Sequence, residues 1–301
     1  MSRAPLRSAI QDIASLLART WRRRPSFRVS LVVMVVLFAV AALGPYIAPY
    51  PKQGLGVEIN ISRALLPPSL EHLLGTDGLG RDMLSRILFA LGRGLYQSLF
   101  VVVVSLALGI VIGSFTALAP RPVEVAVSYL VELLLALPSI LLAALLAILL
   151  GGTATSVTIA LVATWFPWYA RVAYLQARGI RELDFVRIPL YYGLSRTYVV
   201  IRHIGPNILA PMIVEALSDM GGVVLEISAI TFLFGVGISS FEEPDLGMMV
   251  ANGLRDLIRA PWVFIAPAAV LALIAIVFTV FGEAVYEEHH PVLRKRWWLW
   301  F

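Results

Sequence analysis

The longest uncharged stretch of the chain, residues 133–170, limits what this sequence can fold into. It holds no Asp, Glu, Lys or Arg over 38 residues. As a single helix it would be roughly 57 Å long, whereas the hydrocarbon core of a bilayer is about 30 Å thick. The stretch therefore predicts two membrane-spanning helices, and Gly151-Gly152-Thr153 is the natural turn between them.

Four further stretches have the length of a membrane span. Residues 29–51, 94–120 and 262–282 are uncharged, and residues 207–234 are apolar apart from three acids. The first helix of the uncharged stretch 133–170 is the third span in chain order, and we expect it to begin near Val125. Because 59% of the residues are hydrophobic and only 14% are charged, we predict an all-α membrane protein with six transmembrane helices and no soluble domain.

The basic residues predict an orientation. Six spans place both termini, the turn at 121 and the loop 171–206 on one side of the membrane. These four segments hold 17 of the 24 Lys and Arg residues. Since basic loops stay in the cytoplasm, we predict cytoplasmic termini and outside segments at residues 50–95 and 235–261.

The two ends of the chain predict membrane-surface segments around a six-span domain at 29–284. Residues 1–28 are basic and carry apolar side chains at helical spacing, which favours an amphipathic helix on the cytoplasmic surface; a frayed basic tail is the alternative. Those apolar residues are Leu6, Ile10, Ile13, Leu16, Leu17 and Trp21. Residues 285–301 end in RKRWWLWF, which suits the same interface rather than a nucleic acid.

Several kinds of chemistry are excluded or unsupported. The chain has no Cys, so thiol catalysis and Cys-ligated metals are impossible. Its two lysines, Lys52 and Lys295, do not follow a glycine, so no Walker phosphate loop exists. His289 and His290 lack further metal ligands. We therefore predict no catalytic residue, metal or cofactor in this chain.

The segment GTDGLGRDMLSR, residues 75–86, has the composition of a structured turn. Its glycines permit turns that other residues resist, and Asp77 and Asp82 can cap a helix beginning near Arg81. Arg81 and Arg86 can pair with those acids or extend to the outer membrane interface. It lacks the alternating oxygen ligands and closing Glu of a calcium loop.

The run PPSLEHLLGTDGLGRDMLSRILFA, residues 67–90, resembles the outside signature segment of dipeptide/oligopeptide-type ABC importer permeases, PS-x-x-H-x-LGTD-x-x-GRD-x-x-SR. GPYIAPY, RHIGPN and APWVFIAP also resemble motifs of that family, so the similarity covers roughly residues 25–293. The signature positions are Gly75, Thr76, Asp77, Gly80, Arg81, Asp82, Ser85 and Arg86.

This resemblance implies the type I permease architecture of an ATP-driven importer for short peptides, in a prokaryotic inner or plasma membrane. It implies a second homologous permease, two ABC ATPase subunits that bind ATP and Mg, an extracellular or periplasmic solute-binding protein, and lipid as partners. Oligosaccharides or nickel are alternative substrates. An ion-coupled secondary transporter is the competing class.

The resemblance also implies that the cytoplasmic loop 177–206 couples the spans to the ATPase. FVRIPLYYGLS, residues 185–195, aligns with the family's EAA-type loop, but Arg187, Ile188 and Pro189 replace its triplet. Because proline disfavours a helix interior, we expect the coupling helix to start later or to be kinked. A plain interhelical loop is the alternative. The remaining candidates in this loop are Leu190, Tyr191, Tyr192, Gly193 and Ser195.

Three acids in the fifth predicted span, Glu215, Asp219 and Glu226, fall on one helical stripe. Charges inside a bilayer are costly and usually face protein or a water-filled path. The stripe predicts either an acid-lined translocation path for cationic or amine-bearing solutes, or pairing with Arg or backbone groups of neighbouring spans.

Overall fold

The computed structural model describes residues 5–237 and 243–289, and this part of the chain is built from helices without a β-strand. The helices are α1 (Pro5–Arg23), α2 (Pro25–Ile47), α3 (Pro51–Gly54), η1 (Ile61–Arg63), α4 (Met83–Ala117), α5 (Arg121–Ala136), α6 (Ser139–Leu149), α7 (Ala154–Ile180), α8 (Asp184–Tyr191), α9 (Arg196–Val199), η2 (Val200–Ile204), α10 (Gly205–Phe234), α11 (Leu246–Arg255) and α12 (Pro261–His289). The all-α prediction is confirmed, while most of the tail 285–301 lies outside the described residues.

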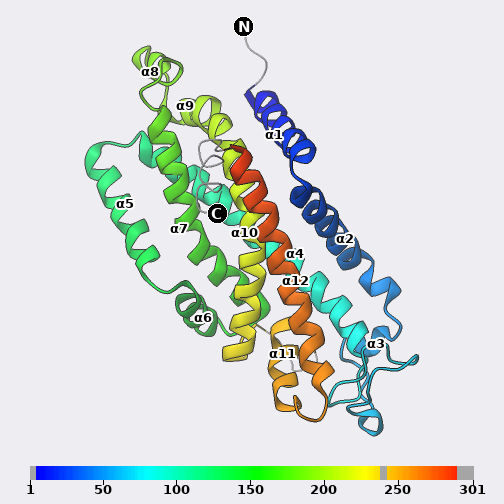
Figure 1. The fold of residues 1–301 in the computed structure, drawn as a ribbon. Coiled ribbons are helices and arrows are strands. Elements are labelled where there is room, and N and C mark those ends of the chain that lie inside the picture. Colours follow the sequence, from blue (N-terminus) through cyan, green and yellow to red (C-terminus); the bar gives the residue numbers. More distant parts are fainter. Residues whose placement is uncertain (1–4, 238–242, 290–301) are drawn as a thin grey trace, which may run out of the picture.

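The long helices run side by side between two ends of the molecule (Figure 1). One end carries α3, the loops of residues 55–82 and α11, and the other carries α1, α8 and α9. The segments predicted to lie outside therefore gather at the first end, and those predicted to lie inside gather at the second.

Four helical stretches are long and apolar enough to cross a membrane: α2, α4, Arg196–Phe234 and Pro261–Glu288. The bent pair α5 and α6 makes a fifth if it counts as one span. Helix α7 has 27 residues but is less apolar, because it carries Trp165, Trp168, Arg171 and Arg178. Length and composition thus support a multi-pass membrane protein with four or five such spans.

The third predicted span is not one continuous helix. Helices α5 and α6 meet at Leu137-Pro138 with a bend of 93°. Leu137 has an extended backbone with ψ 140°, as expected for a residue that precedes proline. The predicted glycine turn after α6 is correct, with φ of +100° at Gly151 and +70° at Gly152.

Glycines allow α4 and α7 to pack closely. A Cβ atom on Gly109 would lie 2.3 Å from the Cβ of Tyr169, and one on Gly113 would lie 2.4 Å from the Ala170 carbonyl oxygen. Small residues at such crossings let helix backbones approach in a membrane. The contact fixes α7 against α4 and buries Tyr169 completely.

The N-terminal segment forms a helix from Pro5 rather than a frayed tail. Leu16 and Thr20 of α1 are buried, and α1 packs against α10 and α12. Arg23 Nη1 lies 2.9 Å from Glu288 Oε1, and Arg24 pairs with Glu287. The end of α1 and the end of α12 are therefore joined at the same end of the bundle.

Candidate functional site

The loop of residues 75–82 is organised around the carboxylate of Asp77. Its Oδ1 accepts hydrogen bonds from the backbone N–H groups of Leu79 and Arg81, both at 2.9 Å, and its Oδ2 accepts one from Arg81 Nε at 2.7 Å. Arg86 Nε lies 3.6 Å from the same Oδ2. Since both arginines are 3% exposed, they pair with an acid and do not extend to the interface.

Asp82 forms the N-cap of α4. Its Oδ2 accepts hydrogen bonds from the Ser85 backbone N–H at 2.8 Å and from Ser85 Oγ at 2.7 Å. The prediction of a capped helix start near Arg81 is confirmed for Asp82, because α4 begins one residue after it. The capping role predicted for Asp77 is wrong, since its oxygens are used within the loop.

The same residues tie distant segments together. Asp82 Oδ1 lies 2.9 Å from His72 Nδ1, and the Asp82 backbone N–H donates to Gln53 Oε1 at 2.9 Å. Thr76 Oγ1 donates to the Arg63 carbonyl at 2.6 Å, and the Thr76 carbonyl accepts from Trp262 Nε1 at 3.2 Å. The contacts of the signature segment therefore hold the loops of residues 50–82 together and against the starts of α4 and α12.

Gly75 and Gly80 make this tight fold possible. Their φ angles are +72° and +71°, in the region that L side chains disfavour. A Cβ atom on Gly80 would lie 1.8 Å from the Asn60 carbonyl oxygen. Both positions therefore require glycine for conformation as well as space.

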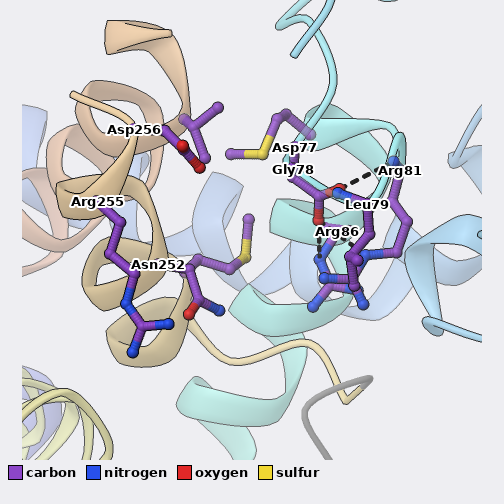
Figure 2. Close-up of a pocket in the computed structure, with 11 residues that line it drawn as sticks. Asp77, Gly78, Leu79, Arg81, Arg86, Asn252, Arg255 and Asp256 are labelled. Carbon is purple, nitrogen blue, oxygen red and sulfur yellow. Dashed lines mark hydrogen bonds and ion pairs between the residues drawn. The ribbon is translucent and has the colours of Figure 1, made fainter. Parts of the chain in front are cut away.

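A pocket of about 290 Å³ lies between this loop and α11. Figure 2 shows Asp77, Arg81 and Arg86 on one wall, with Asn252, Arg255 and Asp256 on the opposite wall. Met83, Met249 and Val263 also line it. Charged groups thus line an otherwise apolar hollow at the end of the molecule that carries the loops.

Arg93, which the sequence did not single out, connects α4 to the segment before α11. Its Nη1 lies 2.8 Å from Glu243 Oε2, and its Nη2 donates to the Gly237 carbonyl at 2.5 Å. One side chain therefore holds both sides of residues 238–242, which lie outside the described residues. In the sequence, Arg93 stood out only as a charged residue directly before the uncharged stretch 94–120.

At the opposite end, α8 presents two aromatic side chains. Tyr191 is 90% exposed and Tyr192 is 79% exposed, with ring centroids 6.0 Å apart. Gly193 has φ +83°, and the N–H groups of Leu194 and Gly193 donate to the carbonyls of Pro189 and Leu190. This is the Schellman arrangement that ends a helix.

The structure corrects one expectation for this loop. Helix α8 starts at Asp184, before Pro189, and contains the proline. Pro189 removes the N–H that would bond to the Phe185 carbonyl, but Phe185 is exposed and water can satisfy that group. Arg187 is exposed as well, whereas Leu190 packs against the core, and Ser195 caps α9 by accepting from the Tyr198 N–H at 3.2 Å.

The three acids of α10 face α7. Glu226 Oε2 accepts a hydrogen bond from Trp165 Nε1 at 2.7 Å. Asp219 lies beside the Tyr169 hydroxyl, and Glu215 is close enough to act on both groups electrostatically. Among the described residues, Trp165 is the hydrogen-bond partner found for these acids, and none of the three pairs with an arginine; Asp219 Oδ2, the Tyr169 hydroxyl and Glu226 Oε1 are buried without a hydrogen-bond partner.

Trp165, Tyr169 and Ser139 therefore belong to this site although the sequence did not indicate them. Ser139, the first residue of α6, lies close enough to Glu226 to act on its carboxylate. Trp165 and Tyr169 are four residues apart, so they lie on one face of α7. The four-residue spacing of Trp165 and Tyr169 was visible in the sequence, but no neighbouring residue indicated that they lie near the acids of α10.

Comparison with known proteins places the chain in a family. Residues 109–294 match the binding-protein-dependent transport system inner membrane component, and residues 15–68 match the N-terminal TM domain of oligopeptide transport permease C. The chain belongs to this family of inner membrane transport components.

Relatives resemble this permease over nearly its whole length. A putative peptide transport system permease protein of Brucella suis is 32% identical over 279 residues, covering 93% of this chain and 92% of the relative. The probable D,D-dipeptide transport system permease protein DdpC of Escherichia coli is 29% identical over 262 residues, covering 87% and 86%. The dipeptide transport system permease protein DppC of Alkalihalophilus pseudofirmus is 28% identical over 267 residues, covering 89% and 86%.

Family membership confirms the resemblance seen in the sequence. The permease is a multi-pass inner membrane protein and the non-catalytic subunit of an ABC transporter, whose ATPase is a separate protein. It works with a binding protein, as the family's description states. Membership in this family decides against the ion-coupled secondary transporter.

Proposed function

We propose that this permease carries short peptides into the cell, after a solute-binding protein delivers them at the end that bears residues 50–95 and α11. The relatives named for peptide or dipeptide transport cover most of the chain. The observation that carries the peptide assignment is the group of Glu215, Asp219 and Tyr169 between α10 and α7. A peptide's amino terminus is a cation, and these groups offer it carboxylate and hydroxyl oxygens. Oligosaccharides carry no such cation, and the relatives named for peptide or dipeptide transport favour a peptide over nickel.

The proposed topology has six spans, with α5 and α6 counted as one and α7 as another. Both termini and α8 face the cytoplasm, in agreement with the excess of basic residues at that end. The face of α1 that does not pack on α10 and α12 rests on the cytoplasmic membrane surface as an amphipathic helix.

In the proposed mechanism, α8 transmits the movement of the ATPase to the membrane spans. Exposed tyrosines are typical anchors of protein interfaces, and Tyr191 and Tyr192 protrude from the end of α8. Binding of ATP and Mg closes two ATPase subunits, α8 moves with them, and the spans of this chain and a second homologous permease open to the other side. Lipid surrounds the complex, and no nucleic acid takes part.

Uptake by the importer reconstituted in liposomes tests the role of the acids. We expect Asp219→Asn to reduce the uptake of peptides with a free amino terminus about tenfold, since a charge-assisted hydrogen bond would be lost. N-acetylated peptides should be taken up equally by the variant and the unchanged protein.

A matched control is Glu283→Gln, which removes an exposed acid of α12 and should leave both uptakes unchanged. Equal loss of free and acetylated peptides in Asp219→Asn would contradict an amine site. Uptake of oligosaccharide or nickel, but of no peptide, would overturn the substrate assignment.

A further inference from the structure

One guanidinium nitrogen in the outer pocket lacks a hydrogen-bond partner. The Arg81 side chain is 4% exposed, and its Nε is held by Asp77. Arg81 Nη1 is buried and has no partner among the described residues, yet Arg81 lines the pocket. Buried donors normally find an acceptor, so an acceptor is expected to enter from outside.

The opposite wall offers further donors toward the same hollow. Asn252 and Arg255 of α11 face Arg81 and Arg86 across the pocket (Figure 2). An amide and a guanidinium donate hydrogen bonds, and a carboxylate accepts several at once. The lining holds three arginines against two acids, Asp77 and Asp256, so it keeps a net positive charge; Asp77 is already held by Arg81 and Arg86.

The size of the pocket and its surroundings indicate a protein as the source of that carboxylate. About 290 Å³ is slightly below the roughly 300–1,000 Å³ of small-molecule sites, so the pocket suits a single side chain. Apolar residues of the same end are fully accessible: Leu70 and Ile258 are each 99% exposed, and Leu254 is 50% exposed. Exposed apolar side chains around a charged hollow are typical of a protein-binding surface.

We propose that this pocket receives the side-chain carboxylate of an Asp or Glu residue on the solute-binding protein. Arg81 and Asn252 bind its oxygens, and Arg255 neutralises its charge at the rim. The proposal rests on the proposed function, because it requires the binding protein to dock at this end.

The test uses Asn252→Asp, a nearly isosteric change that places a negative charge beside the incoming carboxylate. The matched control is Arg121→Gln at the start of α5, which changes the net charge by the same amount at an exposed position outside the pocket and outside the segments proposed to meet the binding protein. The complete importer is placed in lipid nanodiscs, and the affinity of the peptide-free binding protein from the same host is measured by surface plasmon resonance. Because like charges across an interface weaken binding strongly, we expect Asn252→Asp to bind at least about tenfold more weakly and Arg121→Gln to bind as the unchanged importer does.

A second arm separates the binding protein from the substrate as the source of the carboxylate. If Asn252→Asp kept full affinity for the binding protein, the proposal would be overturned. If it selectively reduced the uptake of peptides with a free carboxyl terminus relative to amidated ones, with that affinity unchanged, the pocket would be a substrate site instead. Failure of the unchanged importer to bind any solute-binding protein would overturn the proposed function first, which is a different result.

Discussion

The carboxylate of Asp77 contacts four donors from three residues. Two are backbone N–H groups and two belong to the side chains of Arg81 and Arg86. Such a loop contains little apolar surface of its own, so its order depends on this charge. A buried cation that loses its counterion is strongly destabilising.

We expect Asp77→Asn to lower the free energy of unfolding by about 3–5 kcal/mol, because it keeps an acceptor oxygen but removes the charge between two buried guanidinium groups. Thermal unfolding of the purified protein in detergent measures this. The control is Glu71→Gln, which breaks an exposed pair with Arg63 and should cost less than about 1 kcal/mol. Equal effects of the two changes would show that the charge of Asp77 is not important.

At the scale of single residues, the sequence predicted the contacts that form between residues close together in the chain. The cap formed by Asp82 uses Ser85, three residues away, and such spacing is a local rule. The pairing of Asp82 with His72 and Gln53 depends on how three loop segments meet. The sequence therefore identified the residues of the signature segment, but it could not assign the partners of each.

Apolar runs predicted most of the helices, whereas the break between α5 and α6 required knowledge of the packing. Pro138 ends α5, but Pro45, Pro167, Pro211 and Pro267 lie inside continuous helices. In a membrane, neighbouring helices can satisfy the groups that a proline leaves free. A proline in an apolar run therefore does not by itself predict a break.

The contact between α4 and α7 gives a prediction about helix packing. Gly109→Ala should destabilise the protein by about 1–3 kcal/mol, since the added methyl group would overlap Tyr169. The fraction of protein that stays monodisperse after heating measures this. Gly94→Ala on the same helix is the control, because its added Cβ atom would meet Val224 at 3.9 Å, an ordinary contact. If both variants kept the stability of the unchanged protein, α4 and α7 would not pack this closely.

The end of α8 gives a second prediction at this scale. Gly193→Val should permit insertion and assembly but reduce peptide uptake per ATP hydrolysed severalfold, because valine resists the left-handed backbone that ends α8. Gly179→Val is the control, since a Cβ atom at either position has open space but Gly179 has no positive φ. Comparable coupling in both variants would show that α8 does not connect the spans to the ATPase.

Across the whole molecule, α4 links the two ends on which the proposed mechanism depends. It begins at the signature loop, and the carbonyl of its last residue, Ala117, accepts a hydrogen bond from Arg181 Nη1 at 3.2 Å, just before α8. At 35 residues it is about 52 Å long, enough to cross a bilayer. A movement of α8 can thus reach the outer loops through one rigid element.

The sequence predicted the family and the stripe of three acids, but not the residues that surround the stripe. Glu215, Asp219 and Glu226 were visible as a stripe, yet their partners Trp165 and Tyr169 lie at least 46 residues earlier in the chain. Only the close approach of α7 and α10 brings them together. Among the described residues no arginine pairs with these acids, and the acid-lined path stays a prediction.

Native mass spectrometry of the permease, purified gently from the membranes of its own host, tests the central claim most directly. We expect one copy of this chain together with a second, homologous permease and two ATPase subunits, with the solute-binding protein present before ATP is added. An assembly that contains only copies of this chain, under conditions that preserve other ABC complexes, would contradict the importer.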